Sequence, residues 1–330
     1  MKLRRVSTGG QPIVQIGAGD GWVDTAVALS SLRGELAADD IVCWSSDAVA
    51  LLGAPADVLG RINEAARSLP PSGEPQSVHL PFEPKSFRDF MLYERHAIDA
   101  ARGFVQRFMP GVLPIVRAYE AVLGAPFPAL KPHALWYRQP IYYMGNHLAF
   151  VTDGEAVAIP SYTDALDYEL ELGFVLAHEL FNASPDDAER AIGGFVVVND
   201  FSARDVQRAE MRSGFGPQKA KHFRNGISAV VVSADEILPR WRDLKGSVRI
   251  NGQLISEPSS AGAQWSLGEA LAHASRAERL YPGEFFATGT LPGGSGIETG
   301  RLLTSGDTIE LAIEGVGSLT NLIAAKDSTP

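Results

Sequence analysis

The sequence predicts a β-rich α+β protein with a small N-terminal α+β domain, and three observations support this fold class. From residue 148 to residue 323, short β-branched or alternating segments follow one another between turn residues. Helical patterns are few in that region. A Pro-, Gly- and Ser-rich break, PPSGEPQS, interrupts the chain at residues 70–77. We therefore expect a small domain over residues 1–80 and a larger domain over residues 86–325.

Local patterns define the elements of the N-terminal domain. The segment IVQIGAGDGWVDTAVAL (13–29) predicts a strand, a Gly-Asp-Gly turn and a second strand. Its glycines do not form a dinucleotide-binding fingerprint, because the third Gly of G-x-G-x-x-G is missing. Helices with Asp or Ser near their starts are expected within residues 38–53 and 56–69.

The larger domain begins with a predicted helix within residues 89–108, and a long loop rich in Pro and aromatic residues (127–146) follows. Strands are then expected within residues 148–153, 156–161, 170–177, 194–200, 229–233, 246–252, 284–290, 307–313 and 318–323. Two further helices are expected within residues 186–192 and 266–278. The domain is therefore predicted to be mostly β-structure.

Composition excludes several classes of protein. The formal net charge of −10 argues against a nucleic-acid partner, because phosphate binding requires a basic patch. The longest apolar runs have the length of strands, so no membrane partner is expected. The basic start of the chain has no apolar stretch after it and does not resemble a signal peptide. With Cys43 as the single cysteine, no intrachain disulfide can form, which fits a reducing cytoplasm.

A pair of glutamates is the most informative feature of the strand pattern. In LDYELELGFVLAHEL (166–180), Glu169 and Glu171 point to one face of a strand, while the intervening leucines point into the core. Two neighbouring carboxylates repel each other unless a cation lies between them, and Mg²⁺ or Ca²⁺ prefers such oxygen ligands. On spacing alone, a solvated strand face is the alternative.

A second acidic position follows another predicted strand. In GGFVVVNDFSARDVQ (193–207), Asp200 comes directly after a strongly apolar segment and opens a polar turn. Polar residues at the end of a buried strand are a common way to build a site on a rigid element. The alternative is that Asp200 caps a helix that starts at Ser202.

Five motifs in order resemble one known family. ELEL (169–172), NDFSARDVQ (199–207), GPQKAKHF (216–223), GEFFATGTLPGGSG (283–296) and LLTSGDTIELAIEGVGSLTN (302–321) resemble the core of the fumarylacetoacetate hydrolase family. The resemblance extends over roughly residues 86–323 and implies that this domain is a catalytic mixed β-roll.

The resemblance also implies a metal site and a catalytic apparatus. The family's metal ligands match Asp89, Glu169, Glu171 and Asp200, with Mg²⁺ as the expected ion and Ca²⁺ or Mn²⁺ as alternatives. The implied catalytic residues are the base His96, its orienting partner Glu298, and Lys221 beside the metal; substrate contacts are implied for Tyr143, Arg204, Gln207 and Thr290. For His96, Glu298, Arg204 and Lys221, an ordinary surface position is the alternative reading.

The activity implied is metal-dependent hydrolysis of a carbon–carbon bond in a small anionic β-diketo acid, such as a fumarylacetoacetate, fumarylpyruvate or acylpyruvate. His96 would activate water, and the metal would stabilise the departing enolate. Decarboxylation, isomerisation or hydration of an oxo-acid on the same platform is the alternative. A non-catalytic metal- or ligand-binding scaffold is the third hypothesis. The resemblance further implies a homodimer.

Overall fold

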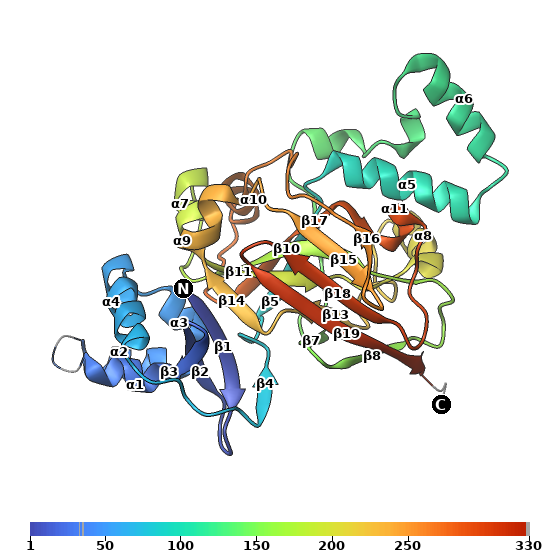
Figure 1. Ribbon diagram of the computed structural model, residues 1–330. Helices are drawn as coiled ribbons and strands as arrows, with labels where there is room; N and C mark the ends of the chain where they lie inside the picture. Colours follow the sequence, from blue (N-terminus) through green and yellow to red (C-terminus); the bar gives the residue numbers. More distant parts are fainter. Residues whose placement is uncertain (33, 35, 328–330) are drawn as a thin grey trace.

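The computed structural model describes residues 1–32, 34 and 36–327, and two large sheets dominate that part of the chain (Figure 1). The 12-stranded sheet contains β1 (Lys2–Ser7), β2 (Ile13–Ala18), β3 (Gly21–Asp24), β4 (Ser77–His79), β5 (Ser86–Phe90), β6 (Tyr142–Met144), β7 (Phe150–Val151), β10 (Glu169–Leu176), β11 (Ile192–Asn199), β13 (Asn225–Ile227), β14 (Val230–Ser233) and β17 (Glu284–Ser295). The five-stranded sheet contains β8 (Ala156–Ile159), β15 (Gly246–Ile250), β16 (Gln253–Ser256), β18 (Thr308–Ile313) and β19 (Gly317–Lys326). A short pair is formed by β9 (Leu166–Asp167) and β12 (Ser202–Ala203).

Helices cover the N-terminal end of the large sheet and project from its other end. They are α1 (Thr25–Ser31), α2 (Ala38–Ser46), α3 (Ala48–Leu52), α4 (Ala56–Arg67), α5 (Glu94–Phe108), α6 (Leu113–Leu123), α7 (Pro185–Arg190), α8 (Arg204–Arg212), α9 (Ala234–Ile237), α10 (Leu267–Ala274) and α11 (Gly296–Thr299). Short 3₁₀ turns occur at Pro128–Leu130, Ala134–Tyr137 and Leu238–Arg240. Figure 1 shows α5 and α6 projecting together beside α11 and α8. Within the described residues, no helix has both the length and the apolar character to cross a membrane.

The order of strands in the large sheet is β3-β2-β1-β14-β11-β10-β17-β5-β6. The N-terminal segment joins this sheet because β1 pairs with β14 in antiparallel fashion. At the other end, β5 lies parallel to β17 and antiparallel to β6. Strands far apart in the sequence are therefore neighbours in the sheet.

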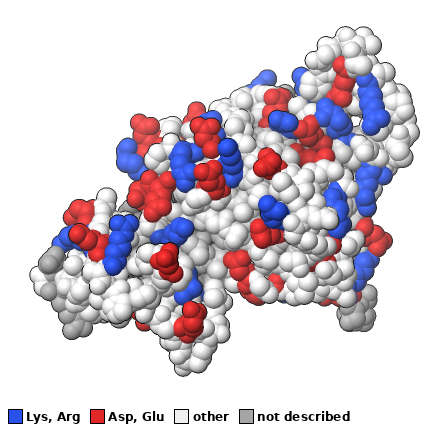
Figure 2. Space-filling view, viewed as in Figure 1, with Lys and Arg blue, Asp and Glu red and all other residues white. Residues whose placement is uncertain are grey.

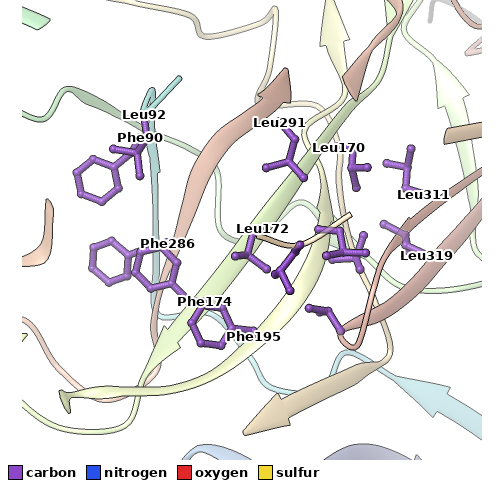
Figure 3. Packing of buried hydrophobic residues seen from close by; sticks show 14 of the residues in the cluster. Phe90, Leu92, Leu170, Leu172, Phe174, Phe195, Phe286, Leu291, Leu311 and Leu319 are labelled. Atoms are coloured by element: carbon purple, nitrogen blue, oxygen red, sulfur yellow. The ribbon is translucent and has the colours of Figure 1, made fainter. Parts of the chain in front are cut away.

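Strand alternation separates two hydrophobic cores. Leu170, Leu172 and Phe174 of β10 point to the core shared with the five-stranded sheet, where they meet Leu311 and Leu319 (Figure 3). The opposite face of the large sheet packs against the N-terminal segment, in a second core that includes residues such as Val175, Val196, Phe87, Phe285 and Ile16. Burial of both faces explains why the central strands are almost continuously apolar.

The predicted fold class is confirmed, and each of the nine expected strand segments contains a strand. The Gly-Asp-Gly turn joins β2 to β3 as a hairpin. The predicted helix within residues 89–108 starts at Glu94, because residues 86–90 form β5. Helices α1 and α6 were not expected, and the second strand expected within residues 21–29 ends at Asp24, where α1 begins. The division into domains at residues 1–80 and 86–325 stays a prediction.

Charged side chains are interspersed on the surface. Figure 2 shows Lys and Arg side chains mixed with Asp and Glu side chains over the face in view. The expectation that the protein has no nucleic-acid partner rests on the net charge of −10 and stays a prediction.

Candidate active site

Five adjacent strands deliver polar side chains to one region of the large sheet. Asp200 directly follows β11, Glu171 lies on β10, Thr290 on β17, Asp89 on β5 and Tyr143 on β6. Glu171 is paired in register with Thr290, and Asp89 with Tyr143. The pairing of strands therefore sets the spacing of these side chains.

The site carboxylates occupy the sheet face of the second core. Residues that are an even number of positions apart on a strand point to the same face. Asp89 lies two residues after Phe87, Asp200 two residues after Val198, and Glu171 four residues before Val175, and these three apolar residues belong to the second core. Asp200 does not cap the next helix, because α8 starts at Arg204 and has no side-chain cap. The acids thus replace apolar residues at one end of a buried strand face.

Asp89, Glu171 and Asp200 form an acidic triad that could hold a metal ion. One carboxylate oxygen from each residue lies within 4.8 Å of the others, and the side chains are almost fully buried. Among the residues that the structure describes, Asp89 Oδ1 and Glu171 Oε2 have no hydrogen-bond partner, although buried polar atoms normally have one. Three buried oxygen donors with unsatisfied atoms fit a hard divalent cation.

Electrostatics in the triad agree with that fit. Burial, and then the charge of Asp200, raises the pKa of Asp89 well above its ordinary value. Burial, and then the charge of Asp89, raises the pKa of Glu171 well above its ordinary value. A divalent cation would reverse this mutual repulsion and favour the ionised carboxylates.

Glu169 is engaged differently from the triad. It is buried, with 4% of its surface exposed, so its strand face is not solvated. Its Oε1 accepts a hydrogen bond from Arg204 Nη2 at 2.6 Å, and its Oε2 accepts one from Lys221 Nζ at 2.5 Å. Burial acts to raise the pKa of Glu169, but Arg204 and Lys221 outweigh burial and lower it. Its predicted role as a fourth ligand stays a prediction.

Asp200 is held by three neighbours. Lys221 Nζ donates to Asp200 Oδ2, and Tyr143 Oη donates to the same oxygen at 2.8 Å. The amide of Asn225, oriented so that its nitrogen acts as donor, reaches Asp200 Oδ1 at 2.8 Å. Burial, and then the charge of Asp200, raises the pKa of Tyr143 well above its ordinary value, so the phenol stays protonated as a donor.

His96 on α5 and Glu298 on α11 lie close together, next to Glu169. His96 Nδ1 is 3.0 Å from Glu298 Oε2, and His96 Nε2 is 3.8 Å from Glu169 Oε1. Glu298 is fixed by a capping box at the start of α11, where its carboxylate accepts from the backbone and side chain of Ser295. Both side chains are buried rather than exposed on the surface.

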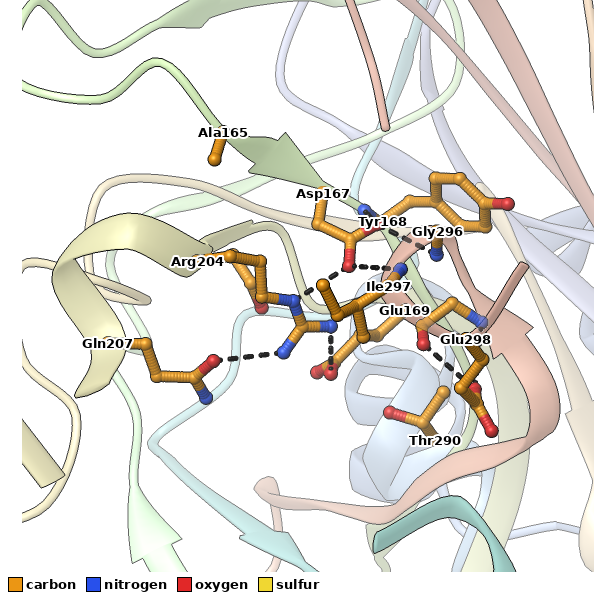
Figure 4. A network of polar contacts seen from close by, with 12 residues as sticks. Ala165, Asp167, Tyr168, Glu169, Arg204, Gln207, Thr290, Gly296, Ile297 and Glu298 are labelled. Carbon is orange, nitrogen blue, oxygen red and sulfur yellow. Dashed lines mark hydrogen bonds and ion pairs between the residues drawn. The ribbon is translucent and has the colours of Figure 1, made fainter. Parts of the chain in front are cut away.

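A buried network links Arg204 to the helix that carries Glu298 (Figure 4). Arg204 Nε donates to Asp167 Oδ2 at 2.7 Å. Asp167 also accepts from the backbone N–H groups of Gly296 and Ile297 at the N-terminus of α11, at 2.8 and 2.9 Å. Arg204 Nη1 donates to Gln207 Oε1 at 3.0 Å. Asp167 was not among the predicted site residues, although it shares the strand face of Glu169 and Glu171.

A cavity of about 760 Å³ opens over this site. Its lining includes all the predicted site residues except Asp200 and Glu298, namely Asp89, His96, Tyr143, Glu169, Glu171, Arg204, Gln207, Lys221 and Thr290. Thr290 Oγ1 also donates to Glu171 Oε1 at 3.2 Å. The residues that sequence reasoning selected are therefore brought together, while their individual roles stay predictions.

Comparison with known proteins identifies the family. The family model described as the fumarylacetoacetate (FAA) hydrolase C-terminal domain matches residues 120–324, more than half of the chain. The chain belongs to the fumarylacetoacetate hydrolase family. The resemblance given by the five motifs is thereby confirmed.

Two relatives illustrate the range of activities named in the family. Oxaloacetate tautomerase YisK of Bacillus subtilis is 33% identical over 162 residues, which are 49% of this chain and 53% of that protein. The 4-hydroxyphenylacetate degradation bifunctional isomerase/decarboxylase of Escherichia coli is 24% identical over 251 residues, which are 70% of this chain and 56% of that protein. The chain thus matches little more than half the length of either relative.

Solved structures share the fold. Fumarylacetoacetate hydrolase from Exiguobacterium antarcticum superposes with a TM-score of 0.68 at 19% identity, covering 99% of this chain and 100% of that chain. Fumarylpyruvate hydrolase from Pseudomonas aeruginosa, solved with Mn²⁺ and pyruvate, gives a TM-score of 0.56 at 20% identity, with 76% of this chain and 93% of that chain covered. At these identities the likeness shows the fold alone.

Proposed function

We propose that this protein is a divalent-metal-dependent hydrolase that cleaves a carbon–carbon bond in a β-diketo acid of the acylpyruvate type. The observation that carries the proposal is the buried pair of His96 and Glu298, 3.0 Å apart, with His96 lining the same cavity as Asp89 and Glu171 of the triad. Hydrolysis needs a base that activates water, and an imidazole oriented by a carboxylate is suited to that role.

The residues of the site support a specific sequence of proton and bond changes. His96 accepts a proton as the oxygen of water bonds to the acyl carbonyl carbon of the substrate. The bond between that carbon and the neighbouring methylene then breaks, and its electron pair forms the enolate of pyruvate. The proton held by the imidazole passes to the methylene carbon, so the products are a carboxylic acid and pyruvate. Glu298 would orient the ring: its Oε2 lies 3.0 Å from His96 Nδ1, a contact that lacks hydrogen-bond geometry in this structure and would have to align when the substrate binds.

The cationic groups of the site would bind the anionic head of the substrate. Lys221 and Arg204 are buried and line the cavity. Burial acts to lower the pKa of each group, but neighbouring carboxylates outweigh it and raise both pKa values, so both stay charged. A divalent cation held by Asp89, Glu171 and Asp200 would supply further positive charge to polarise the chelating oxygens of the substrate.

The test is turnover of a panel of acylpyruvates with added Mg²⁺. We expect His96→Ala to reduce hydrolysis by about 100- to 10,000-fold, the usual contribution of a general base. His178→Ala is the matched control, since His178 is exposed and lies outside the cavity lining. Equal turnover by the wild type and His96→Ala would show that this imidazole is not the base.

Tautomerisation or decarboxylation of oxaloacetate is the second candidate. The tautomerase name of a relative that is 33% identical favours it, and so does the acidic triad, which suits any reaction through an enolate. The same preparation with Mg²⁺ should therefore be given oxaloacetate. Tautomer exchange or CO₂ release with intact acylpyruvates would select this candidate. Metal binding without turnover of any oxo-acid would instead favour a non-catalytic scaffold.

We extend the proposal to the metal, the assembly and the compartment. Mg²⁺ is the proposed ion, with Ca²⁺ and Mn²⁺ as alternatives, since all three accept oxygen ligands. A homodimer is proposed from the family resemblance, and light scattering of the purified chain tests it. A cytoplasmic location is proposed from the single cysteine, Cys43.

A further inference from the structure

The cavity above the triad has two chemically different parts. Its floor carries the charged side chains of Asp89, Glu171, Arg204 and Lys221. Beyond the floor, the lining from α5 and from residues 109–130 is apolar. We call this part the gallery; it is lined by Ala100, Phe104, Val105, Met109, Val112 and Phe127.

Helix α5 leaves room for the gallery. Ala97, Ala100, Ala101, Phe104 and Val105 all line the cavity, and their spacing places them on one face of the helix. Three of the five are alanines, whose small side chains leave space beside the part of the helix nearest His96. The cavity volume of about 760 Å³ lies in the range of roughly 300–1,000 Å³ that accommodates drug-sized ligands. A small oxo-acid head at the floor fills only part of it.

The side of the gallery away from the floor is formed by residues that pack into a small hydrophobic cluster. Val116 of α6 and Leu130 line the cavity, yet they are only 1% and 5% exposed. They form a separate hydrophobic cluster with Ile98 of α5, against which Val105 and Phe127 also pack. The gallery is therefore part of the folded α5–α6 unit.

Besides Arg204, helix α8 contributes two further cations to the cavity lining, Arg208 and Arg212, and the first of these two packs against the gallery. Arg208 of α8 lies with its guanidinium carbon 5.6 Å from the ring centroid of Phe104. Within the described part of the chain, no ion pair is recorded for Arg208. Stacking on Phe104 covers one face of the guanidinium and extends the apolar wall. A carboxylate at the end of a substrate arm is the competing occupant, since it could pair with Arg208.

We propose that the substrate carries an apolar acyl arm, a chain or ring that lies in the gallery while its oxo-acid head lies at the floor. The position of the head rests on the proposed function. The gallery would select among substrates by burying apolar surface, a favourable and non-directional contribution.

Binding of 2-oxo-acids that cannot be cleaved tests the gallery separately from catalysis. Dissociation constants would be measured by calorimetry with Mg²⁺ for unbranched 2-oxo-acids from pyruvate to 2-oxooctanoate. We expect binding to tighten by up to about fourfold per added methylene. Equal-length acids that end in a carboxylate should bind more weakly. A flat series, or tighter binding of the carboxylate-ended acids, would overturn the proposal.

Substitution at Ala100 gives the matched comparison. Ala100→Trp should fill the gallery, so that long-chain acids bind about as weakly as pyruvate while pyruvate binding is unchanged; Ala100→Leu should give a partial effect if the larger change prevents folding. Ala118→Trp on the exposed face of α6 should preserve the full chain-length series. Chain-length dependence that persists in Ala100→Trp would place the arm elsewhere. If affinity rises with chain length but no acylpyruvate is turned over, the hydrolase proposal is wrong and the gallery proposal is supported. If acylpyruvates are turned over but affinity does not change with chain length, the gallery proposal is wrong and the hydrolase proposal is supported.

Discussion

Asp167 connects Arg204 to α11, the helix that carries Glu298. Among the described residues, every recorded hydrogen bond of its side chain is accepted: one from Arg204 and one each from the backbone N–H groups of Tyr168, Gly296 and Ile297. Asp167→Asn would turn an amide donor toward these donors and remove a charge from a fully buried ion pair. We expect a loss of about 3 kcal/mol in the free energy of unfolding, measured with urea, and a lower kcat because α11 no longer holds Glu298 in place.

Asp187→Asn provides the matched control for Asp167. Asp187 also pairs with an arginine, Arg190, but on the exposed surface of α7. Exposed ion pairs contribute little to stability, so the unfolding midpoint and kcat should match the wild type. Equal effects of the two substitutions would contradict the connecting role of Asp167.

The raised pKa values of Asp89 and Glu171 predict how pH and Mg²⁺ act together. Burial is the main cause of both shifts. A carboxyl whose pKa is higher in the folded than in the unfolded protein holds its proton more tightly when folded. Ionisation of this carboxyl therefore destabilises the folded protein as the pH rises above about 4, which is the pKa of the group in the unfolded chain. Mg²⁺ needs the deprotonated carboxylates, so it should stabilise the protein more at higher pH.

Thermal unfolding with and without Mg²⁺ measures this linkage. At about 100 times its dissociation constant, the ion should add about 2.7 kcal/mol, and the increase in Tm should be larger near pH 8 than near pH 5.5. Glu171→Gln should abolish most of the increase, whereas Glu257→Gln at an exposed position should preserve it. An increase in Tm that is the same at both pH values would argue against the triad as the binding site.

Site residues could be predicted from the sequence where the evidence for them lies in neighbouring positions of the chain, and not where it depends on distant partners. Strand alternation predicts that Glu169 and Glu171 share a face, whereas His96 and Glu298 required the family resemblance. Asp167 lies at the preceding position of the same alternation, but its partners Arg204 and Gly296 are 37 and 129 residues away in the chain. No local pattern brings such partners together, because only the sheet topology does so.

The contact between α5 and α11 is the element on which the His96–Glu298 pair depends. A Cβ at Gly103 of α5 would lie 1.9 Å from the carbonyl oxygen of Ile297 in α11, so the two helices approach closely only because this residue is glycine. We expect Gly103→Ala to displace α5 and lower kcat by about 10- to 100-fold, since misplacement by an ångström has effects of that order. Steady-state kinetics on the best acylpyruvate would measure it.

Gly60→Ala separates this steric effect from helix propensity. Gly60 lies within α4 and has open space where a Cβ would be. Alanine there should raise the free energy of unfolding by about 0.5–1 kcal/mol and leave kcat unchanged. If Gly103→Ala also left kcat unchanged, the contact between the helices would not determine the geometry of the His96–Glu298 pair.

Helix α6 shows why one element escaped prediction. Its ends carry ordinary signals, with Pro114 in the first turn and Gly124 in the left-handed conformation at the C-terminus. Its apolar residues do not form one clear stripe, however, since Val116 is buried while Ile115 and Val122 are exposed. The strands, whose alternate residues fill two cores, gave a much stronger pattern.

At the scale of the whole molecule, the N-terminal segment completes a hydrophobic core of the 12-stranded sheet. Val14 and Ile16 of β2 belong to the same hydrophobic cluster as Val175, Val198 and Phe285 at the centre of that sheet. Through the pairing of β1 with β14, both parts also share backbone hydrogen bonds. Residues on both sides of the predicted boundary near residue 80 therefore belong to one continuous hydrophobic core.

Continuity of this core predicts a single cooperative unfolding transition. Ile16→Ala, at a fully buried position, should lower the free energy of unfolding by about 2–5 kcal/mol even though Ile16 lies outside the site. Because the core is shared, loss of activity and loss of far-ultraviolet circular dichroism should follow the same urea curve in this variant. Ile115→Ala, at a position 63% exposed on α6, should change stability by less than about 0.5 kcal/mol. If activity survived a first transition in which only part of the dichroism was lost, the N-terminal segment would unfold separately and the site would depend on the sheet alone.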